Sequence, residues 1–180
     1  MSEGKMVAPK FLTREICEYA VTRILEMVER LDGPFHYVKL HDGRPNCHIV
    51  ILVPSMKDDR ATDYPDWPRY ALEPIALYEH SSGDTNEWRH SYKDIARCKA
   101  LQLWHERNDG GTDVLPHLLF SGDTPYWGGV KRDGIVVACS GFESWLDRMI
   151  AGMIADACIG TAYDAWMISD ERFNREDFLP

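Results

Sequence analysis

Residues Gly122–Asp147, GDTPYWGGVKRDGIVVACSGFESWLD, combine a double-glycine loop, a turn, an apolar strand and a helix start in one short stretch. Asp133-Gly134 is a turn signal, and Ile135–Cys139 is typical of a buried β-strand. Ser140–Glu143 has the Ser-x-x-Glu form of a capping box, in which hydroxyl and carboxylate each satisfy a backbone amide. The stretch therefore predicts a sharp strand-to-helix transition, whose free amide groups suit an anionic ligand group.

Three amphipathic helices are predicted around this stretch from apolar residues at spacings of three and four. The first runs from a Thr13 cap to about Leu31, the second from about Glu87 to Asn108, and the third from the capping box to about Trp166. Lys99 falls inside the apolar arc of the second helix. Its ammonium must therefore reach out to solvent, find a carboxylate or face a polar pocket.

The remaining segments predict strands. Residues 35–40 and 47–53 predict a hairpin around a His41-Asp42-Gly43 turn, and further short strands are expected over 72–80 and 114–120. Because helices and strands do not alternate regularly, the order favours an α+β layer with a mainly antiparallel sheet over a doubly wound fold.

The length of 180 residues suits a single domain. We expect an N-terminal arm over 1–12, one domain over 13–168 with an irregular excursion at 54–86, and a C-terminal tail over 169–180. The net charge of −9 disfavours nucleic-acid binding, and no apolar run is long enough for a membrane span. The first ten residues lack the apolar core of a secretory signal, and the five cysteines form no Cys-x-x-Cys pair, so a cytoplasmic location is expected.

The chain resembles the GlcG/HbpS-like family of haem-degrading or haem-binding domains. The matching residues are Ile95–Ala100, Gly128-Gly129-Val130, Asp133-Gly134, Ile135–Gly141 and Asp147 with the alanine-rich helix beyond it. The resemblance implies a profilin-like fold, with an antiparallel sheet flanked by helices, a homo-oligomer, and in some members bound haem. Two features depart from the family: Lys131 stands where proline usually follows Gly-Gly-Val, and the 54–86 excursion is longer.

The candidate site residues gather around the opening stretch. Backbone amides at Gly128, Gly129, Ser140 and Gly141 suit a carboxylate, and Trp127 and Arg97 complete the set of ligand-binding candidates. Lys99 and Asp147 are the catalytic candidates, with a cationic role for the first and proton transfer for the second. Asp147 is predicted to lie two turns into the last helix and away from its apolar face, where a solvated carboxylate is the competing interpretation.

The histidines give no local metal motif, because neither His-x-x-x-His nor His-Glu-x-x-His occurs. Candidate ligands for a metal or a haem iron are His36, His48, His90 and His117; His105 is predicted to be exposed. Three functions stay open. The first is a protein that binds haem or a small aromatic or organic acid between helix 87–108 and residues 122–147, the second an enzyme with lyase-like or isomerase-like proton transfer on such an acid, and the third a non-catalytic structural or regulatory oligomer.

Overall fold

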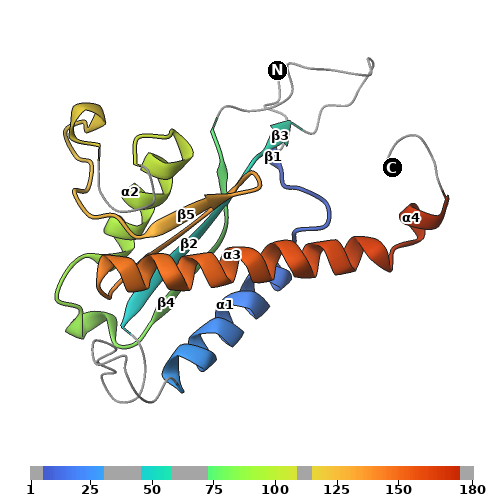
Figure 1. The fold of residues 1–180 in the computed structure, drawn as a ribbon, viewed down its shortest axis with the longest axis horizontal. Helices are drawn as coiled ribbons and strands as arrows, with labels where there is room; N and C mark the ends of the chain where they lie inside the picture. Colours follow the sequence, from blue (N-terminus) through green and yellow to red (C-terminus); the bar gives the residue numbers. More distant parts are fainter. Residues whose placement is uncertain (1–5, 31–45, 58–72, 109–114, 175–180) are drawn as a thin grey trace.

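A four-stranded antiparallel sheet forms the centre of the protein (Figure 1). The computed structural model describes residues 6–30, 46–57, 73–108 and 115–174. The strand order is β4-β2-β6-β5, and the strands are β2 (Cys47–Val53), β4 (Ile75–Ser82), β5 (Gly129–Arg132) and β6 (Ile135–Ser140). This confirms the predicted α+β class with its antiparallel sheet. The strand predicted over 72–80 is β4, whereas the predicted strand at 35–40 lies outside the described residues.

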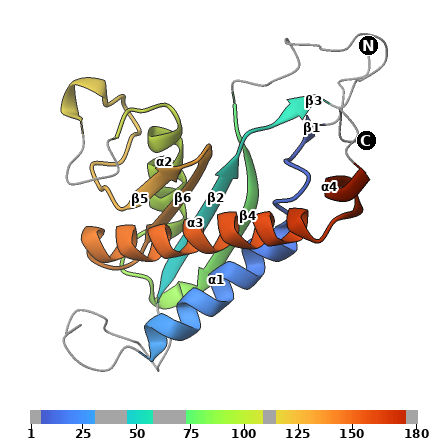
Figure 2. The ribbon, with the colours of Figure 1, turned by 45° about the vertical axis from the view of Figure 1, so that its right-hand side comes forward.

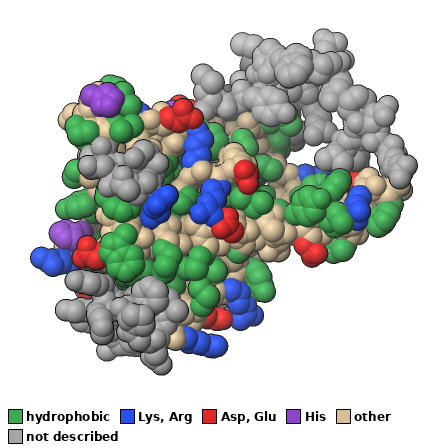
Figure 3. Space-filling view, in the orientation of Figure 1, with side chains coloured by type: hydrophobic (Ala, Val, Ile, Leu, Met, Phe, Trp, Pro, Cys, Tyr) green, Lys and Arg blue, Asp and Glu red, His purple; other side chains and the backbone are tan. Residues whose placement is uncertain are grey.

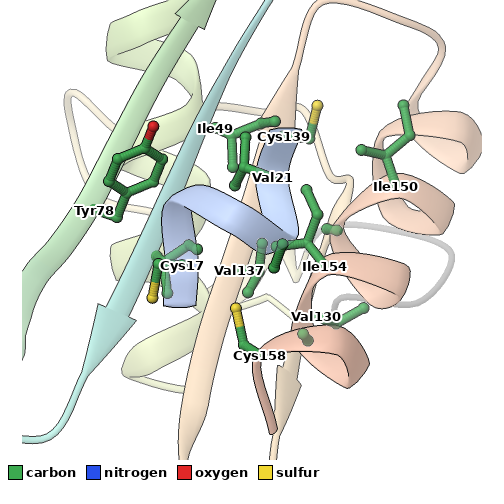
Figure 4. Close-up of a cluster of buried hydrophobic side chains, with 14 of the residues drawn as sticks. Cys17, Val21, Ile49, Tyr78, Val130, Val137, Cys139, Ile150, Ile154 and Cys158 are labelled. Carbon is green, nitrogen blue, oxygen red and sulfur yellow. The ribbon is translucent and has the colours of Figure 1, made fainter. Parts of the chain in front are cut away.

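Helices cover both faces of the sheet, which explains why β2 and β6 are buried along their whole length. Helices α1 (Arg14–Glu29) and α3 (Ser144–Met167) lie on one face, and α2 (Tyr92–Trp104) lies on the other (Figures 1 and 2). Side chains of a strand alternate between faces. Ile49 and Val137 therefore pack with Val21 and Ile150 from α1 and α3 (Figure 4), while Val50, Val136 and Ala138 pack with Ala96 and Ala100 from α2.

The ends of the chain add smaller elements. Within the predicted N-terminal arm, β1 (Met6–Val7) pairs with β3 (Met56–Lys57) in a separate two-stranded sheet. Thr13 is the cap of α1, as predicted, and its hydroxyl accepts a hydrogen bond of 3.4 Å from the Ile16 amide. In the predicted tail, α4 (Asp170–Asn174) follows α3. Large hydrophobic side chains are exposed in this part of the chain: Tyr163 in α3, Ile168 directly after it and Phe173 in α4. Figure 3 shows hydrophobic side chains on the surface at this end of the molecule.

The predicted capping box at Ser140 is wrong. Ser140 is the last residue of β6, where it lies opposite His48 of β2 and is buried, and Glu143 is the N-cap of α3 without a side-chain hydrogen bond. Pairing with β2 thus extends the strand into the motif. The Phe142 amide just before the helix is satisfied by Asp147, whose Oδ1 accepts its hydrogen bond at 3.1 Å.

Two further boundaries differ from the sequence predictions. The described part of the predicted strand 114–120 contains a 3-10 turn, η3 (Pro116–Leu118), because proline has no N–H to donate to a sheet. The predicted helix 87–108 is shorter at both ends: the 3-10 turn η2 (Thr85–Glu87) precedes it, and the chain leaves the helix after Trp104, with Glu106 at a positive φ of 58°.

The turn after β6 leaves no room for a side chain at Gly141. Its φ is +151°, and a β-carbon there would lie 2.1 Å from the Asn46 carbonyl oxygen. Gly122 has a φ of +91° but no neighbour within 4 Å of its missing β-carbon, so it is the matched control. We expect Gly122→Ala to lower the free energy of unfolding by about 1 kcal/mol through backbone strain alone, and Gly141→Ala to lower it clearly more. Urea unfolding measures both, and equal losses would contradict the packing described here.

Candidate functional site

The side chain of Lys99 forms a buried ion pair with Asp147. Lys99 is 2% exposed, and its Nζ lies 2.8 Å from Oδ2 of Asp147 and donates a second hydrogen bond of 3.0 Å to the Cys139 carbonyl. The pair therefore joins α2 on one side of the sheet to α3 on the other, past the end of β6. Of the three environments predicted for Lys99, the structure shows the carboxylate partner.

Asp147 is buried, so its predicted position away from the apolar face is wrong. It is 1% exposed and belongs to the first turn of α3, because the helix begins at Ser144. From there the carboxylate reaches back to the Phe142 amide and across to Lys99. Burial raises the pKa of Asp147 to about 7, because the cost of desolvating the carboxylate outweighs the stabilisation from Lys99 and the Phe142 amide.

The double-glycine loop packs directly against this ion pair. Gly128 has a φ of +124°, and a β-carbon there would come within 2.7 Å of the Asp147 β-carbon and 3.1 Å of the Lys99 Nζ. At Gly129 a β-carbon would lie 2.6 Å from Cδ1 of Leu103 on α2. Both glycines are thus required by close packing, a reason other than the predicted contact between their amides and a ligand.

The other predicted ligand-binding residues lie in different places. Ser140 is buried in the sheet, Gly141 packs on Asn46, and Trp127 is half-buried. Arg97 is exposed and forms an ion pair with Glu79 of β4, at 2.9 Å. The structure therefore brings together Lys99, Asp147 and Gly128 but places Arg97 in a separate cluster.

The histidine candidates do not converge. His48 is buried between Ser81 and Glu79, and His90 and His117 are exposed, as is His105, in agreement with its prediction. His36 lies outside the described residues. Within the described part of the chain, no three histidine, cysteine or carboxylate side chains are grouped to hold a metal ion.

A recess lies between the end of α2 and β5, in the region predicted for a pocket between helix 87–108 and residues 122–147, but none of the predicted site residues is among its described lining. Its cavity volume is about 380 Å³, and it is lined by Leu103, Glu106, Asn108, Leu115, Val130, Lys131, Arg132 and Arg148. No histidine in the described ranges lines it, so the residues present offer no axial histidine for a haem there. The sequence signal was the pair Lys131-Arg132 directly after the family-like Gly-Gly-Val, but Leu103, Leu115 and Arg148 come from distant segments.

The three cationic side chains of this recess differ in their partners. Lys131 donates to the Glu106 carboxylate at 3.0 Å and to the Trp104 carbonyl at 3.2 Å. Arg132 forms an ion pair with Asp156 and donates to the Gly152 carbonyl at 3.4 Å. Arg148 has no acidic partner among the described residues. Lys131 and Arg132 are therefore held in place by acidic partners, whereas no acidic residue of the described ranges holds Arg148.

Comparison with known proteins found no matching family model, no matching curated protein and no matching solved structure. A search of the described residues found no helix that is both long enough and apolar enough to span a membrane.

Removing the cation tests the contribution of the ion pair. Lys99→Met keeps the length and apolar stem of the side chain but leaves Asp147 buried without its partner. Breaking a buried pair in this way costs about 3 to 5 kcal/mol, so we expect a loss of this size in the free energy of unfolding. Lys93→Met, an exposed position on the same helix, is the control and should change stability little. Equal stability of the two variants would contradict the structural role.

The raised pKa of Asp147 gives a pH dependence with a defined sign. Between its ordinary value of 3.8 and about 7, the folded protein keeps a proton that the unfolded chain has lost. The contribution of Asp147 to the free energy of unfolding therefore falls as pH rises through this window and is constant above it. Asp147→Asn should remove this downward slope from a urea-unfolding series at pH 4 to 8. Asp164→Asn, exposed on the same helix, should leave it in place.

Proposed function

We propose that this protein binds a small organic anion, a carboxylate on an aromatic or short aliphatic body, in the recess between α2 and β5. The observation that carries the proposal is the charge of the recess. Among the described residues, three cationic side chains and one carboxylate line it, in a chain whose net charge is −9. A local excess of positive charge on an acidic protein favours an anion at that place.

The residues that line the recess would make different kinds of contact with such an anion. Arg148 carries a planar guanidinium fork, which matches a carboxylate in a two-pronged hydrogen-bonded pair. Lys131 and Arg132, held by Glu106 and Asp156, add positive charge at fixed positions. Leu103, Val130 and Leu115 supply the apolar surface against which a ring or a short chain packs. A cavity of about 380 Å³ suits a small molecule.

The buried ion pair is linked to this recess through Leu103 and the double-glycine loop. Lys99 and Leu103 lie one turn apart on α2, and Gly129 packs on Leu103 while Gly128 packs on the ion pair. Lys99 and Asp147 do not line the recess. A general acid or base must come within hydrogen-bonding reach of its substrate, so binding is favoured over the lyase-like or isomerase-like alternative.

The family resemblance concerns the fold of the protein. A four-stranded antiparallel sheet with helices on both faces supports a profilin-like arrangement, which we propose as the finer description of the fold. Haem binding, also implied by the resemblance, gains no support from the recess. The assembly of several copies stays a prediction.

Benzoate and its neutral counterpart benzamide test the proposal as a matched pair of ligands. We expect benzoate to raise the melting temperature and to give saturable heats in calorimetric titration, and benzamide to do neither at the same concentration. Removing the guanidinium in Arg148→Gln should weaken benzoate binding at least about tenfold, because a hydrogen bond to a charged group contributes about 1.5 to 3 kcal/mol.

Arg23→Gln is the control variant, because Arg23 is an exposed arginine on α1 that pairs with Glu26 and is not part of the recess. It should bind benzoate as the unaltered protein does. If no member of a panel of aromatic and aliphatic carboxylates binds, the proposal fails. If Arg148→Gln binds them with unchanged affinity, the anion site lies elsewhere.

A further inference from the structure

A continuous hydrogen-bonded chain of serine, histidine and glutamate lies on the α2 face of the sheet, at the β4 edge. The hydroxyl of Ser81 is 2.9 Å from Nδ1 of His48, and Nε2 of the same ring is 3.2 Å from the Glu79 carboxylate. His48 of β2 and Ser81 of β4 are direct partners in the register of these two strands. The strand pairing itself therefore holds the three side chains together.

The proton positions in this chain follow from its acceptors. A carboxylate can only accept, so the ring proton of neutral His48 lies on Nε2 and is donated to Glu79. Nδ1 is then the free acceptor that faces the Ser81 hydroxyl. Burial lowers the pKa of His48, which is 2% exposed, and so favours its neutral form. A neutral imidazole aimed at a hydroxyl is the arrangement in which histidine acts as a general base.

The glutamate is itself fixed in position. Arg97 of α2 donates from Nε to both carboxylate oxygens of Glu79, at 3.1 and 3.2 Å, and its second guanidinium nitrogen adds a contact at 2.9 Å. Glu79 thus orients His48, and Arg97, a predicted ligand-binding residue, orients Glu79.

An exposed residue and a buried donor lie beside His48. Ser81 is an exposed residue although its partner His48 is buried. The indole of Trp88 meets the His48 ring edge-on, with 6.3 Å between ring centroids. Its Nε1–H is buried and has no acceptor in the described part of the chain. Buried donors are normally satisfied, and an acyl carbonyl oxygen would be a suitable acceptor.

We propose that Ser81 is the nucleophile of a second site, which cleaves small carboxylic esters, with His48 as its general base. The Ser81 oxygen attacks the ester carbonyl and forms a new C–O bond, while its proton moves to Nδ1 of His48. The ester C–O bond then breaks, and the leaving alkoxide takes that proton and departs as an alcohol. Water hydrolyses the acyl-serine by the same route, which restores Ser81 and releases the carboxylic acid.

This site is independent of the recess. Ser81 and Glu79 belong to β4 and Lys131 and Arg132 to β5, which are the two opposite edges of the sheet. Failure of the benzoate experiment would therefore leave the ester-cleaving proposal untouched, and the reverse also holds.

A fluorophosphonate probe, which forms a covalent bond with activated serines, tests the proposal on the full chain. We expect mass spectrometry to find the adduct on Ser81 and p-nitrophenyl acetate to be hydrolysed above the rate in buffer. Ser81→Ala should abolish both. Ser82→Ala is the matched control, since Ser82 is the next residue of β4 and its side chain points to the other face, and it should change neither.

The base is tested separately from the nucleophile. His48→Gln should lower the labelling rate at Ser81 at least tenfold, with far-ultraviolet circular dichroism showing that the fold is retained. Should that variant not fold, the pH profile of labelling in the unaltered protein takes its place, and the rate should rise as His48 loses its proton in the field of Glu79, Lys93 and Arg97. Absence of an adduct on Ser81 under probe excess, or a labelling rate indifferent both to His48→Gln and to pH, would overturn the proposal.

Discussion

The ion pair between Lys99 and Asp147 is the contact on which the arrangement of α2, β6 and α3 depends. Taking both charges out of water is costly, and the pair repays this cost only if its remaining polar atoms are satisfied. The Cys139 carbonyl accepts from Lys99 and the Phe142 amide donates to Asp147, so each charged group has a further partner in the backbone around the end of β6. Gly128 then has to be glycine, because a side chain there would collide with the pair.

The sequence alone predicted the helices and strands that depend on the local spacing of apolar residues. The β-branched residues of 47–53 predicted a strand, the apolar run at 135–139 predicted a buried strand, and the spacing after Thr13 predicted a capped helix. Helical spacing fixes which face a residue occupies, so the apolar arc around Lys99 left three environments for its ammonium, of which the structure has the carboxylate partner. The same spacing places Asp147 on the buried face of α3 with Ile150, Ala151 and Ile154, so its predicted position away from the apolar face is wrong.

The remaining features depend on how distant segments pair, which no local pattern specifies. Ser140 has the sequence of a helix cap, yet pairing with β2 keeps it in the strand, and Asp147 takes the neighbouring amide. The recess joins side chains from α2, β5 and α3 with Leu115 from a connecting segment. Ser81 faces His48 only through the register of two strands that are separated by a long excursion. Each of these requires the sheet order before the residues can be brought together.

Helix α2 connects the two proposed sites through its rotation about its own axis. At about 100° per residue, Leu103 lies within about 40° of Lys99 one turn further on, whereas Arg97 points about 200° away from Lys99. The ion pair fixes this rotation from inside the protein. One face then presents Leu103 to Gly129 and the recess, and the other presents Arg97 to Glu79 at the β4 edge. The buried Lys99 contacts neither proposed ligand, yet it sets the position of a side chain in each site. This role is a sufficient physical reason for the free energy that its desolvation costs.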